Sequence, residues 1–325
     1  MKKAFITGIT GQDGSYLSEL LLERGYEVHG LVRPDASRER ENPFWRIEPF
    51  REKLTLHSGS VENYRAMVRV MEEVKPDECY HLAAQTFVSQ SFDHEIATMN
   101  ANVNGALNIL SAAKQAGSPC RIFFPGSAEM FGRTNISPQN EATPFHPGSI
   151  YGVSKTCGFE LVRHYRETHG MFAVTGILYN HESPRRGIRF VTRKITSSAA
   201  KIKLGLAKEI RLGNIETRRD WGFAGDTVKA MHKMLQADTP EDYVIATGKT
   251  HSVKDFLEMA FGELDLDYKK YLVVDPEFFR KSEACILVGD PNKAKTRLLW
   301  EPETTFPEMV KNMAISDLNF FKKTS

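Results

Sequence analysis

The stretch AFITGITGQDGSYL, residues 4–17, decides the fold of this 325-residue chain. Its apolar start predicts a short buried strand, and the apolar residues after the last glycine recur at helical spacing. Between the two, Gly8 permits a tight turn, Gly11 lets the backbone approach a pyrophosphate, and Gly14 permits close packing of helix on strand. A helix N-terminus offers free N–H groups and a partial positive charge to phosphates, so this loop predicts dinucleotide binding.

Strand-like and helix-like segments keep alternating to about residue 180, which predicts a parallel, doubly wound sheet. After residue 180 the pattern loosens into shorter elements. We therefore predict an α/β fold: a Rossmann-type doubly wound parallel sheet in residues 1–180 and a smaller C-terminal α/β substrate-binding lobe in 181–325. The boundary is interleaved, with some return of the chain to the first domain. The expected strands are 4–7, 27–32, 78–82, 121–124, 172–178, 209–212 and 243–246; the expected helices are 15–24, segments around 67–71 and 103–113, 149–164, 191–204, 226–235, and two that begin near 252 and 306.

Composition and charge exclude several classes of protein. The chain has 43 Lys and Arg against 41 Asp and Glu, a net charge of +2, so it lacks the basic excess of a nucleic-acid binder. No apolar run approaches the roughly 18 residues of a membrane span, and the first residues lack the pattern of a signal peptide. Four cysteines stand far apart without a CxxC pair, and ten histidines include no HExxH. We expect a cytoplasmic, soluble protein without a metal.

The end of the second predicted strand indicates which dinucleotide binds. An NAD enzyme usually places an acidic residue there, whereas an arginine can receive the 2′-phosphate of NADP. This strand ends Leu31-Val32-Arg33, with Ser37 and Arg38 soon after. The pattern favours NADP; the alternative is that Arg33 is a solvated loop cation.

Tyr151-Gly-Val-Ser-Lys155 places a phenol and an ammonium one turn apart on a predicted helix, so both side chains share a face. We expect the charge of Lys155 to lower the pKa of Tyr151 and its ammonium to hold the ribose hydroxyls of the cofactor. A tyrosine tuned in this way can exchange a proton with a sugar hydroxyl. By themselves, these residues predict an NADP-linked enzyme that acts on a hydroxyl group.

Together these motifs resemble the extended short-chain dehydrogenase/reductase (NAD-dependent epimerase/dehydratase) family, and within it the GDP-mannose 4,6-dehydratases, along nearly the whole chain. The glycine loop and YxxxK are generic to the superfamily, whereas the NHESPRRG, FVTRK and RDWG segments are specific to this branch. The segments that carry the resemblance are 8–17 (GITGQDGSYL), 82–85 (LAAQ), 180–187 (NHESPRRG), 190–195 (FVTRKI), 212–214 (LGN), 219–222 (RDWG) and 289–295 (GDPNKAK).

The resemblance implies a catalytic set of Ser127, Glu129, Tyr151 and Lys155. Tyr151 would take the proton from the sugar O4 while C4 gives its hydride to NADP. Glu129 would then remove the hydrogen on C5, the C6 hydroxyl would leave as water, and the stored hydride would return to C6. Ser127 would hydrogen-bond the reacting oxygen. The cofactor would thus stay bound and be regenerated in each turnover.

The resemblance also implies the residues that hold cofactor and substrate. The cofactor set is Gly8, Ile9, Thr10, Gly11, Gln12, Asp13, Gly14, Arg33, Ser60, Val61, Leu82, Ala83, Ala84, Gln85, Tyr151, Lys155, His181 and Arg186. The substrate set is Ser127, Glu129, Asn180, Val191, Lys194, Leu212, Gly213, Asn214, Arg219, Arg280 and Glu283. Guanidinium forks suit diphosphate oxygens, and a carboxylate suits the donor edge of guanine or a ribose hydroxyl. We interpret Trp221 as core packing.

The chain departs from the family pattern at four places. Ser60-Val61 replace an acidic residue near the adenine, Ala128 replaces a small polar residue, and Gly148-Ser-Ile150 replace the usual arginine before the tyrosine. The loop after Arg33 differs from an Arg- and Ser-rich loop that takes part in subunit contacts in family members. The resemblance implies a homodimer or homotetramer.

The resemblance implies a GDP-mannose substrate and the product GDP-4-dehydro-6-deoxy-D-mannose, with no nucleic-acid or membrane partner. Three alternatives stay open: a GDP-4-keto-6-deoxy-sugar reductase, a GDP-heptose 4,6-dehydratase, and a non-catalytic NADP-binding scaffold. A reductase needs no base at C5, so Glu129 counts against it, and retention of all four catalytic residues counts against a scaffold.

The positions of the charges suggest a neutral surface around a locally basic cleft. Arg33 and Arg38 stand beside the predicted 2′-phosphate site. The remaining cations in segments proposed to hold cofactor or diphosphate are Arg185, Arg186, Arg189, Arg193, Lys194, Arg218, Arg219, Arg280 and Lys281.

Overall fold

A seven-stranded parallel sheet forms the centre of the computed structural model, which describes residues 1–34, 42–117, 119–279 and 286–324. The strand order reverses between β1 and β4, and open α/β sheets bind ligands at the carboxyl ends of the strands beside such a reversal. The Rossmann-type α/β fold predicted from the sequence is confirmed. The strands, in spatial order, are β10 (Tyr243–Ile245), β6 (Ala173–Leu178), β5 (Arg121–Ser127), β4 (Glu78–His81), β1 (Lys3–Thr7), β2 (Glu27–Val32) and β3 (Leu54–Ser58).

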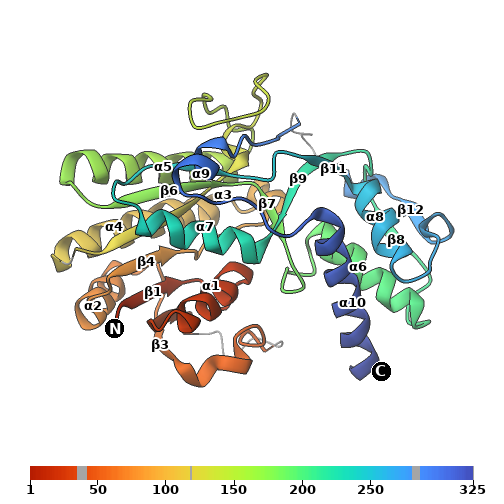
Figure 1. Ribbon diagram of the computed structural model, residues 1–325, viewed down its shortest axis with the longest axis horizontal. Helices are drawn as coiled ribbons and strands as arrows, with labels where there is room; N and C mark the ends of the chain where they lie inside the picture. The colour runs from red at the N-terminus through yellow and green to blue at the C-terminus, as the bar shows by residue number, and fades with distance from the viewer. Residues whose placement is uncertain (35–41, 118, 280–285, 325) are drawn as a thin grey trace.

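Helices cover both faces of the sheet (Figure 1). On one face, α1 and α7 pack through residues such as Leu17 and Met231; on the other, α2, α4 and α5 pack through residues such as Val70 and Ile109. None of the helices in the described ranges is long and apolar enough to cross a membrane. The helices are α1 (Gln12–Glu23), α2 (Tyr64–Val74), α3 (Glu95–Met99), a π-helical turn (Asn100–Asn104), α4 (Gly105–Ala116), α5 (Ile150–His169), α7 (Ala224–Gln236) and α9 (Asn292–Arg297).

Several boundaries differ from those expected. Strand β3 was not expected, because its sequence LTLHS is polar at alternate positions, and in the structure it lies at the sheet edge and is partly exposed. Strand β5 continues through Pro125 and Gly126 to Ser127, which carries Ser127 to the ligand-facing edge. The segment expected as a loop after Arg33 is described only from residue 42, where it leads into the short 3₁₀ helix Glu48–Lys53.

A smaller lobe with its own hydrophobic core stands to the right of the sheet in Figure 1. Residues 224–245, which form α7 and β10, return to the central sheet, as do α9 and Trp300. Trp221 is buried in the lobe core, with its ring 5.5 Å from that of Phe256, in line with its interpretation as packing. The lobe elements are β7 (Asn180–Glu182), α6 (Val191–Lys203), β8 (Ile210–Leu212), β9 (Arg218–Phe223), β11 (Thr250–Ser252), α8 (Val253–Gly262), β12 (Leu272–Val274) and α10 (Phe306–Thr324).

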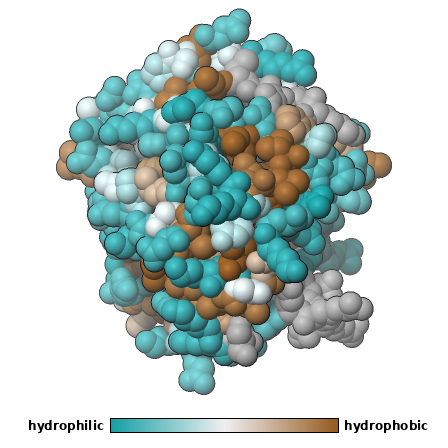
Figure 2. All heavy atoms as spheres, turned by 90° about the vertical axis from the view of Figure 1, so that its right-hand side faces the viewer, coloured by the Kyte–Doolittle hydropathy of each residue, from teal (hydrophilic) through white to brown (hydrophobic). Residues whose placement is uncertain are grey.

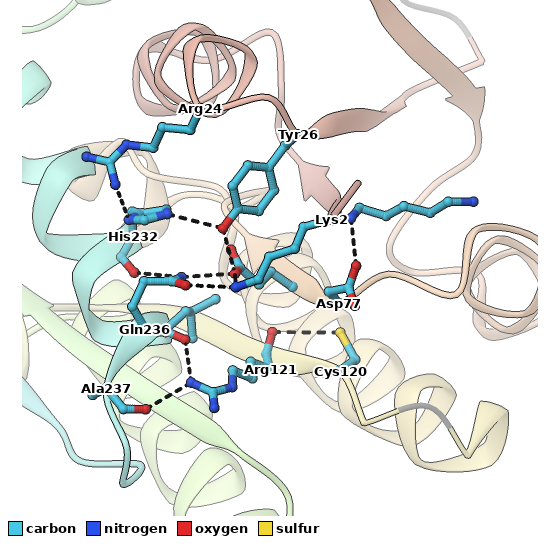
Figure 3. Close-up of polar contacts among 12 residues, drawn as sticks. Lys2, Arg24, Tyr26, Asp77, Cys120, Arg121, His232, Gln236 and Ala237 are labelled. Atoms are coloured by element: carbon cyan, nitrogen blue, oxygen red, sulfur yellow. Dashed lines mark hydrogen bonds and ion pairs between the residues drawn. The ribbon is translucent and has the colours of Figure 1, made fainter.

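A buried carboxylate at the start of β4 ties helix α7 to the amino-terminal ends of the sheet strands, away from the ligand edge. Glu78 is 1% exposed and accepts hydrogen bonds from Lys2 Nζ (3.2 Å), Tyr26 Oη (2.9 Å), Gln236 Nε2 (2.9 Å) and Tyr80 Oη (2.7 Å). Figure 3 shows the side chains of Lys2, Tyr26 and Gln236 converging from three different segments. Since buried charges are tolerated only when they are fully hydrogen-bonded, this cluster fixes how α7 docks on the sheet.

His232 of α7 extends this cluster in a single tautomer. Arg24 Nη1 lies 2.9 Å from His232 Nδ1, and an arginine can only donate, so Nδ1 must be the acceptor. The neutral ring therefore carries its proton on Nε2, which donates to Tyr26 Oη at 3.2 Å. Burial and the charge of Arg24 lower the pKa of His232 from 6.5 to about 4.

The protein is expected to lose stability as the pH falls from about 6.5 towards 4, because the unfolded chain then binds a proton that folded His232 refuses. With allowance for solvent screening, the loss is about 1–2 kcal/mol. Denaturant unfolding of the wild type and of His232→Asn at a series of pH values measures it. The variant should show a shallower decline over this range, and equal slopes would contradict the assignment.

Candidate active site

A cleft of about 390 Å³ opens at the carboxyl ends of the strands, between the sheet and the smaller lobe. Its walls come from segments far apart in sequence, including the ends of β4, β5 and β6, the start of α5 and the start of α6. The members of the predicted catalytic, cofactor and substrate sets that line it are Asp13, Leu82, Ala84, Ser127, Glu129, Tyr151, Lys155, Asn180, His181, Arg186, Val191, Lys194, Leu212, Gly213, Asn214 and Arg219.

The glycine loop has the form of a phosphate cradle. Gly8 has φ +73°, and a Cβ on it would lie 2.8 Å from the backbone nitrogen of Ala83. A Cβ on Gly14 would lie 2.4 Å from the Gly8 carbonyl oxygen. Helix α1 begins after Gly11, and no side chain caps its N-terminus. These residues fit a dinucleotide, because the backbone can approach the pyrophosphate and the first N–H groups of α1 can receive it. Within the described ranges, no group of three His, Cys, Asp or Glu side chains is arranged to hold a metal ion.

The side chains of the glycine loop reach the NHESPRRG segment, a contact that the sequence did not predict. Gln12 Nε2 donates to the His181 carbonyl oxygen (3.1 Å), and Ser183 Oγ donates to Gln12 Oε1 (2.8 Å). Asp13 Oδ2 lies 2.8 Å from His181 Nε2. The sequence predicts both segments as parts of the site, and this interlock joins the glycine loop directly to the start of the smaller lobe.

Asp13 and His181 form an ion pair at the cleft wall. Burial opposes the charge of Asp13, but the charge and hydrogen bond of His181 outweigh it and lower the pKa of Asp13 to about 2. Burial likewise opposes protonation of His181, and Asp13 reverses this, so that the pKa of His181 is raised above 6.5. The aspartate therefore stays ionised and engaged at neutral pH.

The start of α5 packs tightly on the turn that follows β5. Ser149 caps α5 by accepting a hydrogen bond from the Gly152 backbone nitrogen (3.0 Å), so the Gly148-Ser-Ile150 departure supplies the helix cap. A Cβ on Gly152 would lie 2.6 Å from the Glu129 carbonyl oxygen. The glycine of YxxxK is thus required for close approach, and this approach brings Tyr151 beside Ser127 and Glu129.

The expected effect of Lys155 on Tyr151 is not seen. Burial raises the pKa of Tyr151 to about 12, against a lowering by its hydrogen bond with Ser127. Lys155 Nζ donates instead to the Pro125 carbonyl oxygen at 2.8 Å, and burial lowers its own pKa to about 8. The prediction was wrong for the protein alone because desolvation penalises both charged forms. Positive charge brought into the cleft with a ligand would favour the phenolate.

Among the described residues, three carboxylates line the cleft, and two of them are engaged. Asp13 is paired with His181, and Glu182 accepts from Thr192 Oγ1 (2.5 Å) and lies 3.1 Å from Arg186 Nε. In the part of the chain that the structure describes, the carboxylate of Glu129 accepts no hydrogen bond. Glu129 lies beside Ser127 and Tyr151, so the cleft offers one available carboxylate next to a phenol and a hydroxyl. This arrangement suits proton transfer to and from a bound alcohol and the carbon next to it.

The basic cleft is smaller than the sequence suggested. Arg186, Arg189, Lys194 and Arg219 line it. Three other described cations that the sequence assigned to the segments proposed to hold cofactor or diphosphate are bound elsewhere: Arg185 to Glu19 (2.7 Å), Arg193 to Asp317 (2.5 Å) and Arg218 to the Thr250 carbonyl oxygen (2.7 Å). Neighbouring residues of a helix or strand point in different directions, so a basic segment cannot direct every charge to one cavity.

Other members of the predicted sets lie elsewhere. The side chains of Ile9 and Val61 are buried in the cores on either side of the sheet, so only their backbone could face a ligand, and Arg33 is exposed at the end of β2. Gly8, Thr10, Gly11, Gln12, Gly14, Ser60, Ala83 and Gln85 lie outside the set that lines the cleft. Ser37, Arg38, Arg280, Lys281 and Glu283 fall outside the described residues.

The cleft also has an apolar wall that was not predicted. The rings of Phe87 and Phe190 lie 5.5 Å apart, edge to face, and the guanidinium of Arg186 lies 3.6 Å from the centre of the Phe190 ring. On the lobe side, Lys194 Nζ lies 3.7 Å from the centre of the Phe278 ring. Nothing in the spacing of these aromatic residues distinguishes them from core residues.

Asp220 of the RDWG segment connects strand β9 of the smaller lobe to loops beside the central sheet. Its carboxylate is 1% exposed and accepts from Thr247 Oγ1 (2.6 Å) and from the backbone nitrogens of Thr247 (2.9 Å), Gly248 (3.0 Å) and Gly289 (3.2 Å). One carboxylate thus joins β9, the loop after β10 and the GDPNK segment. Burial raises its pKa, and these four hydrogen bonds oppose the rise.

Replacing Asp220 by Ala is expected to lower the free energy of unfolding by about 3 kcal/mol, because the Thr247, Gly248 and Gly289 N–H groups and the Thr247 hydroxyl lose a buried, charged acceptor. Denaturant unfolding measures the change. Asp238→Ala, at an exposed position, is the matched control and should change stability by less than about 0.5 kcal/mol. A wild-type midpoint for Asp220→Ala would mean that these bonds contribute nothing.

Comparison with known proteins relates the chain to one family. A family model described as GDP-mannose 4,6 dehydratase matches residues 5–313. The chain is 45% identical to GDP-mannose 4,6 dehydratase 1 of Arabidopsis thaliana, over 99% of this chain and 91% of that protein. It is 42% identical to GDP-mannose 4,6 dehydratase of Homo sapiens, over 98% and 92%. Among solved structures, RMD from Pseudomonas aeruginosa complexed with NADPH superposes with a TM-score of 0.81 at 21% identity, over 98% of both chains, a likeness of fold.

Proposed function

The chain belongs to the GDP-mannose 4,6-dehydratase family, and from this premise we propose that it converts GDP-D-mannose to GDP-4-dehydro-6-deoxy-D-mannose and water. It is an enzyme of the hydro-lyase type that works with a nicotinamide cofactor. The observation that carries the proposal is the position of Glu129, an available carboxylate beside Ser127 and Tyr151 in the cleft. Water loss needs such a base next to the oxidised carbon, whereas reduction of a ketone does not.

The catalytic roles follow from the chemistry of the side chains. Tyr151 takes the proton of the sugar O4, with Ser127 hydrogen-bonded to the same oxygen and Lys155 holding the ribose. A nicotinamide cofactor held at the glycine loop would supply reversible hydride transfer to and from the sugar. Once C4 is a ketone the proton on C5 is acidic, and Glu129 removes it and protonates the departing C6 hydroxyl. One carboxylate then serves as base and as acid. When C6 is reduced, C5 regains a proton, and the proton that Tyr151 took from O4 balances it.

We assign cofactor binding to residues 1–180 and most of the nucleotide-sugar binding to 181–325. The glycine loop and the first turn of α1 hold the pyrophosphate. The cations of the cleft wall hold the diphosphate of the substrate, since guanidinium groups match its oxygens. The proposed substrate clamp is Asn180, Val191, Lys194, Leu212, Gly213, Asn214 and Arg219, together with Arg280 and Glu283, which lie outside the described residues.

The experiment is incubation of the purified protein with GDP-mannose, without added reductant, followed by mass analysis of the sugar nucleotide. Loss of one water, with the amount of bound cofactor unchanged, supports the proposal. Unaltered GDP-mannose would refute the proposal. Loss of water from a GDP-heptose but not from GDP-mannose would change the assigned substrate to the heptose. Consumption of NADPH only in the presence of a 4-keto sugar would indicate the reductase.

We propose NADP as the cofactor, supported by Arg33 at the end of β2, where NAD enzymes usually carry an acid. Arg33→Ala is expected to weaken NADP binding by about tenfold, because a charge-assisted hydrogen bond to the 2′-phosphate is lost. NAD binding should stay within about twofold. Calorimetric titration of the cofactor-free protein with each dinucleotide measures both, and an equal loss for the two would contradict a 2′-phosphate contact.

We further propose a cytoplasmic homodimer or homotetramer. Figure 2, which faces the smaller lobe, shows hydrophobic atoms gathered in patches on an otherwise hydrophilic surface. Exposed large hydrophobic residues of the smaller lobe include Ile315 and Phe320 of α10. Patches of this kind support contact with another protein surface. Light scattering of the purified protein gives the mass of the assembly, and a monomer across working concentrations would refute this part.

A further inference from the structure

The buried ion pair between Arg193 and Asp317 lies behind the substrate side of the cleft. Asp317, on α10, is fully buried. Its two carboxylate oxygens lie 2.8 and 2.9 Å from Arg193 Nε, and Oδ1 also lies 2.5 Å from Arg193 Nη2. Oδ2 accepts a hydrogen bond from Thr196 Oγ1 at 2.6 Å. Both charges are withdrawn from water, a costly arrangement that needs excellent geometry. Here the geometry is a guanidinium fork on one carboxylate.

Arg193 also reaches the loop that leads into the cleft. Its Nη1 donates to the carbonyl oxygens of Pro184 and Arg186, the latter at 3.1 Å. These two residues belong to the segment 183–190, which connects β7 to α6 and which we call the strap. One guanidinium therefore holds a carboxylate of the last helix and two carbonyls of the strap at once.

The strap and the first turn of α6 carry much of the substrate wall. Arg186, Arg189, Val191 and Lys194 line the cleft, whereas Arg193 faces α10. Successive residues of a helix are turned by about 100°, so anchoring Arg193 sets the directions of its neighbours on α6. No described residue of α10 lines the cleft, so Asp317 can influence ligand binding only through its partners on α6, of which Arg193 is the one that also bonds the strap.

Other contacts hold the strap from different sides. Glu182 engages Arg186 and Thr192, and Arg46 Nε donates to the Arg185 carbonyl oxygen at 2.7 Å. Among the described residues that bond to the strap, Arg193 alone connects it to the C-terminal helix. Helix α10 packs along α6 and so forms the fixed support of this link.

We propose that Asp317 is a positioning residue for the GDP-sugar: through Arg193 it holds the strap and the first turn of α6 at the spacing that binds the diphosphate. This rests on the proposed function of the cleft. A positioning role predicts weaker nucleotide binding with the chemistry largely kept, whereas a role in stability alone predicts a lower melting temperature with binding unchanged.

The test compares Asp317→Asn and Arg193→Lys with the wild-type holoenzyme. Arg193→Lys keeps a positive charge opposite Asp317 but cannot reach both strap carbonyls, because an ammonium lacks the planar fork. We expect both variants to raise KM for GDP-mannose about tenfold with kcat within about threefold. The Kd of GDP, measured by calorimetry on the holoenzyme, should rise by a similar factor, and Asp317→Glu should recover part of the loss.

Lys311→Ala is the matched control, because Lys311 also lies on α10 but pairs with Glu263 at the surface, 3.9 Å away. It should leave KM, kcat and GDP binding unchanged. If Asp317→Asn fails to fold, the KM and GDP affinity of Arg193→Lys test the inference instead. A folded Arg193→Lys with wild-type KM and GDP affinity would overturn the inference. The Kd of GDP can be measured without turnover. A wild-type protein that is inactive on GDP-mannose would therefore refute the proposed reaction, while the comparison of GDP affinities would still test the role of Asp317.

Discussion

Replacing Glu129 by Gln is expected to stop the enzyme with the sugar oxidised at C4 and its C6 hydroxyl still in place. An amide keeps the size of the side chain but cannot take the C5 proton, so the rate of water loss should fall by about 10³-fold. Neither of the other two carboxylates among the described residues of the cleft can replace it. Asp13 is held by His181 with a pKa of about 2, and Glu182 is buried under Thr192 and Arg186.

The measurement is single-turnover mass analysis of the sugar nucleotide, together with the absorbance of reduced nicotinamide. The variant should show the absorbance without loss of water. Asp13→Asn is the informative comparison, because it alters another cleft carboxylate and should leave the ratio of oxidation to water loss unchanged. Full turnover by Glu129→Gln would remove Glu129 from the mechanism and leave the proposal without its base.

Replacing Tyr151 by Phe is expected to lower kcat by about 10²–10⁴-fold, the range for loss of a general acid–base group. Tyr151→Phe stops the reaction at oxidation of C4, an earlier step than the one stopped by Glu129→Gln. We therefore expect neither reduced nicotinamide nor the dehydrated sugar nucleotide to accumulate. Burial raises the pKa of Tyr151 to about 12, and among the groups of the cleft Ser127 and Arg186 oppose this rise. Because the base must be the phenolate, the wild-type rate should increase with pH on the alkaline side.

Stopped-flow measurement of the first turnover at several pH values tests this expectation. Tyr64→Phe is the matched control, since the Tyr64 hydroxyl donates to Gln115 on the outer surface, and its loss should not change the rate. A Tyr151→Phe enzyme that still oxidises C4 would show that another group takes the proton. A wild-type rate that falls with rising pH would contradict a tyrosine base.

Much of the site could be predicted because its motifs are local. The glycines at 8, 11 and 14 act within one turn, and Tyr151 and Lys155 are one helical turn apart, so spacing alone puts them together. The ends of parallel strands meet at one edge, which explains why Ser127 at the end of β5 and Glu129 just after it lie in the same cleft as Asn180 after β6.

The electrostatics could not be predicted in this way. The sequence suggested that Lys155 lowers the pKa of Tyr151, but burial of both side chains reverses the direction. It also suggested that Arg185, Arg193 and Arg218 belong to the basic cleft, but each has a partner outside it. The free energy of a charge depends on its solvation and its neighbours, and both come from segments distant in the chain.

The sequence by itself determined the class of fold and the order of most central elements, because these follow from periodicity and short spacing, and its resemblance to a family pointed to the proposed reacting side chains. Only the tertiary structure decided which charges face the cleft, that Gln12 and Asp13 join the cofactor loop to the NHESPRRG segment, and that Asp317 supports the strap from α10. Those contacts join residues more than 120 positions apart, and such pairings are set by how whole elements pack rather than by local preference.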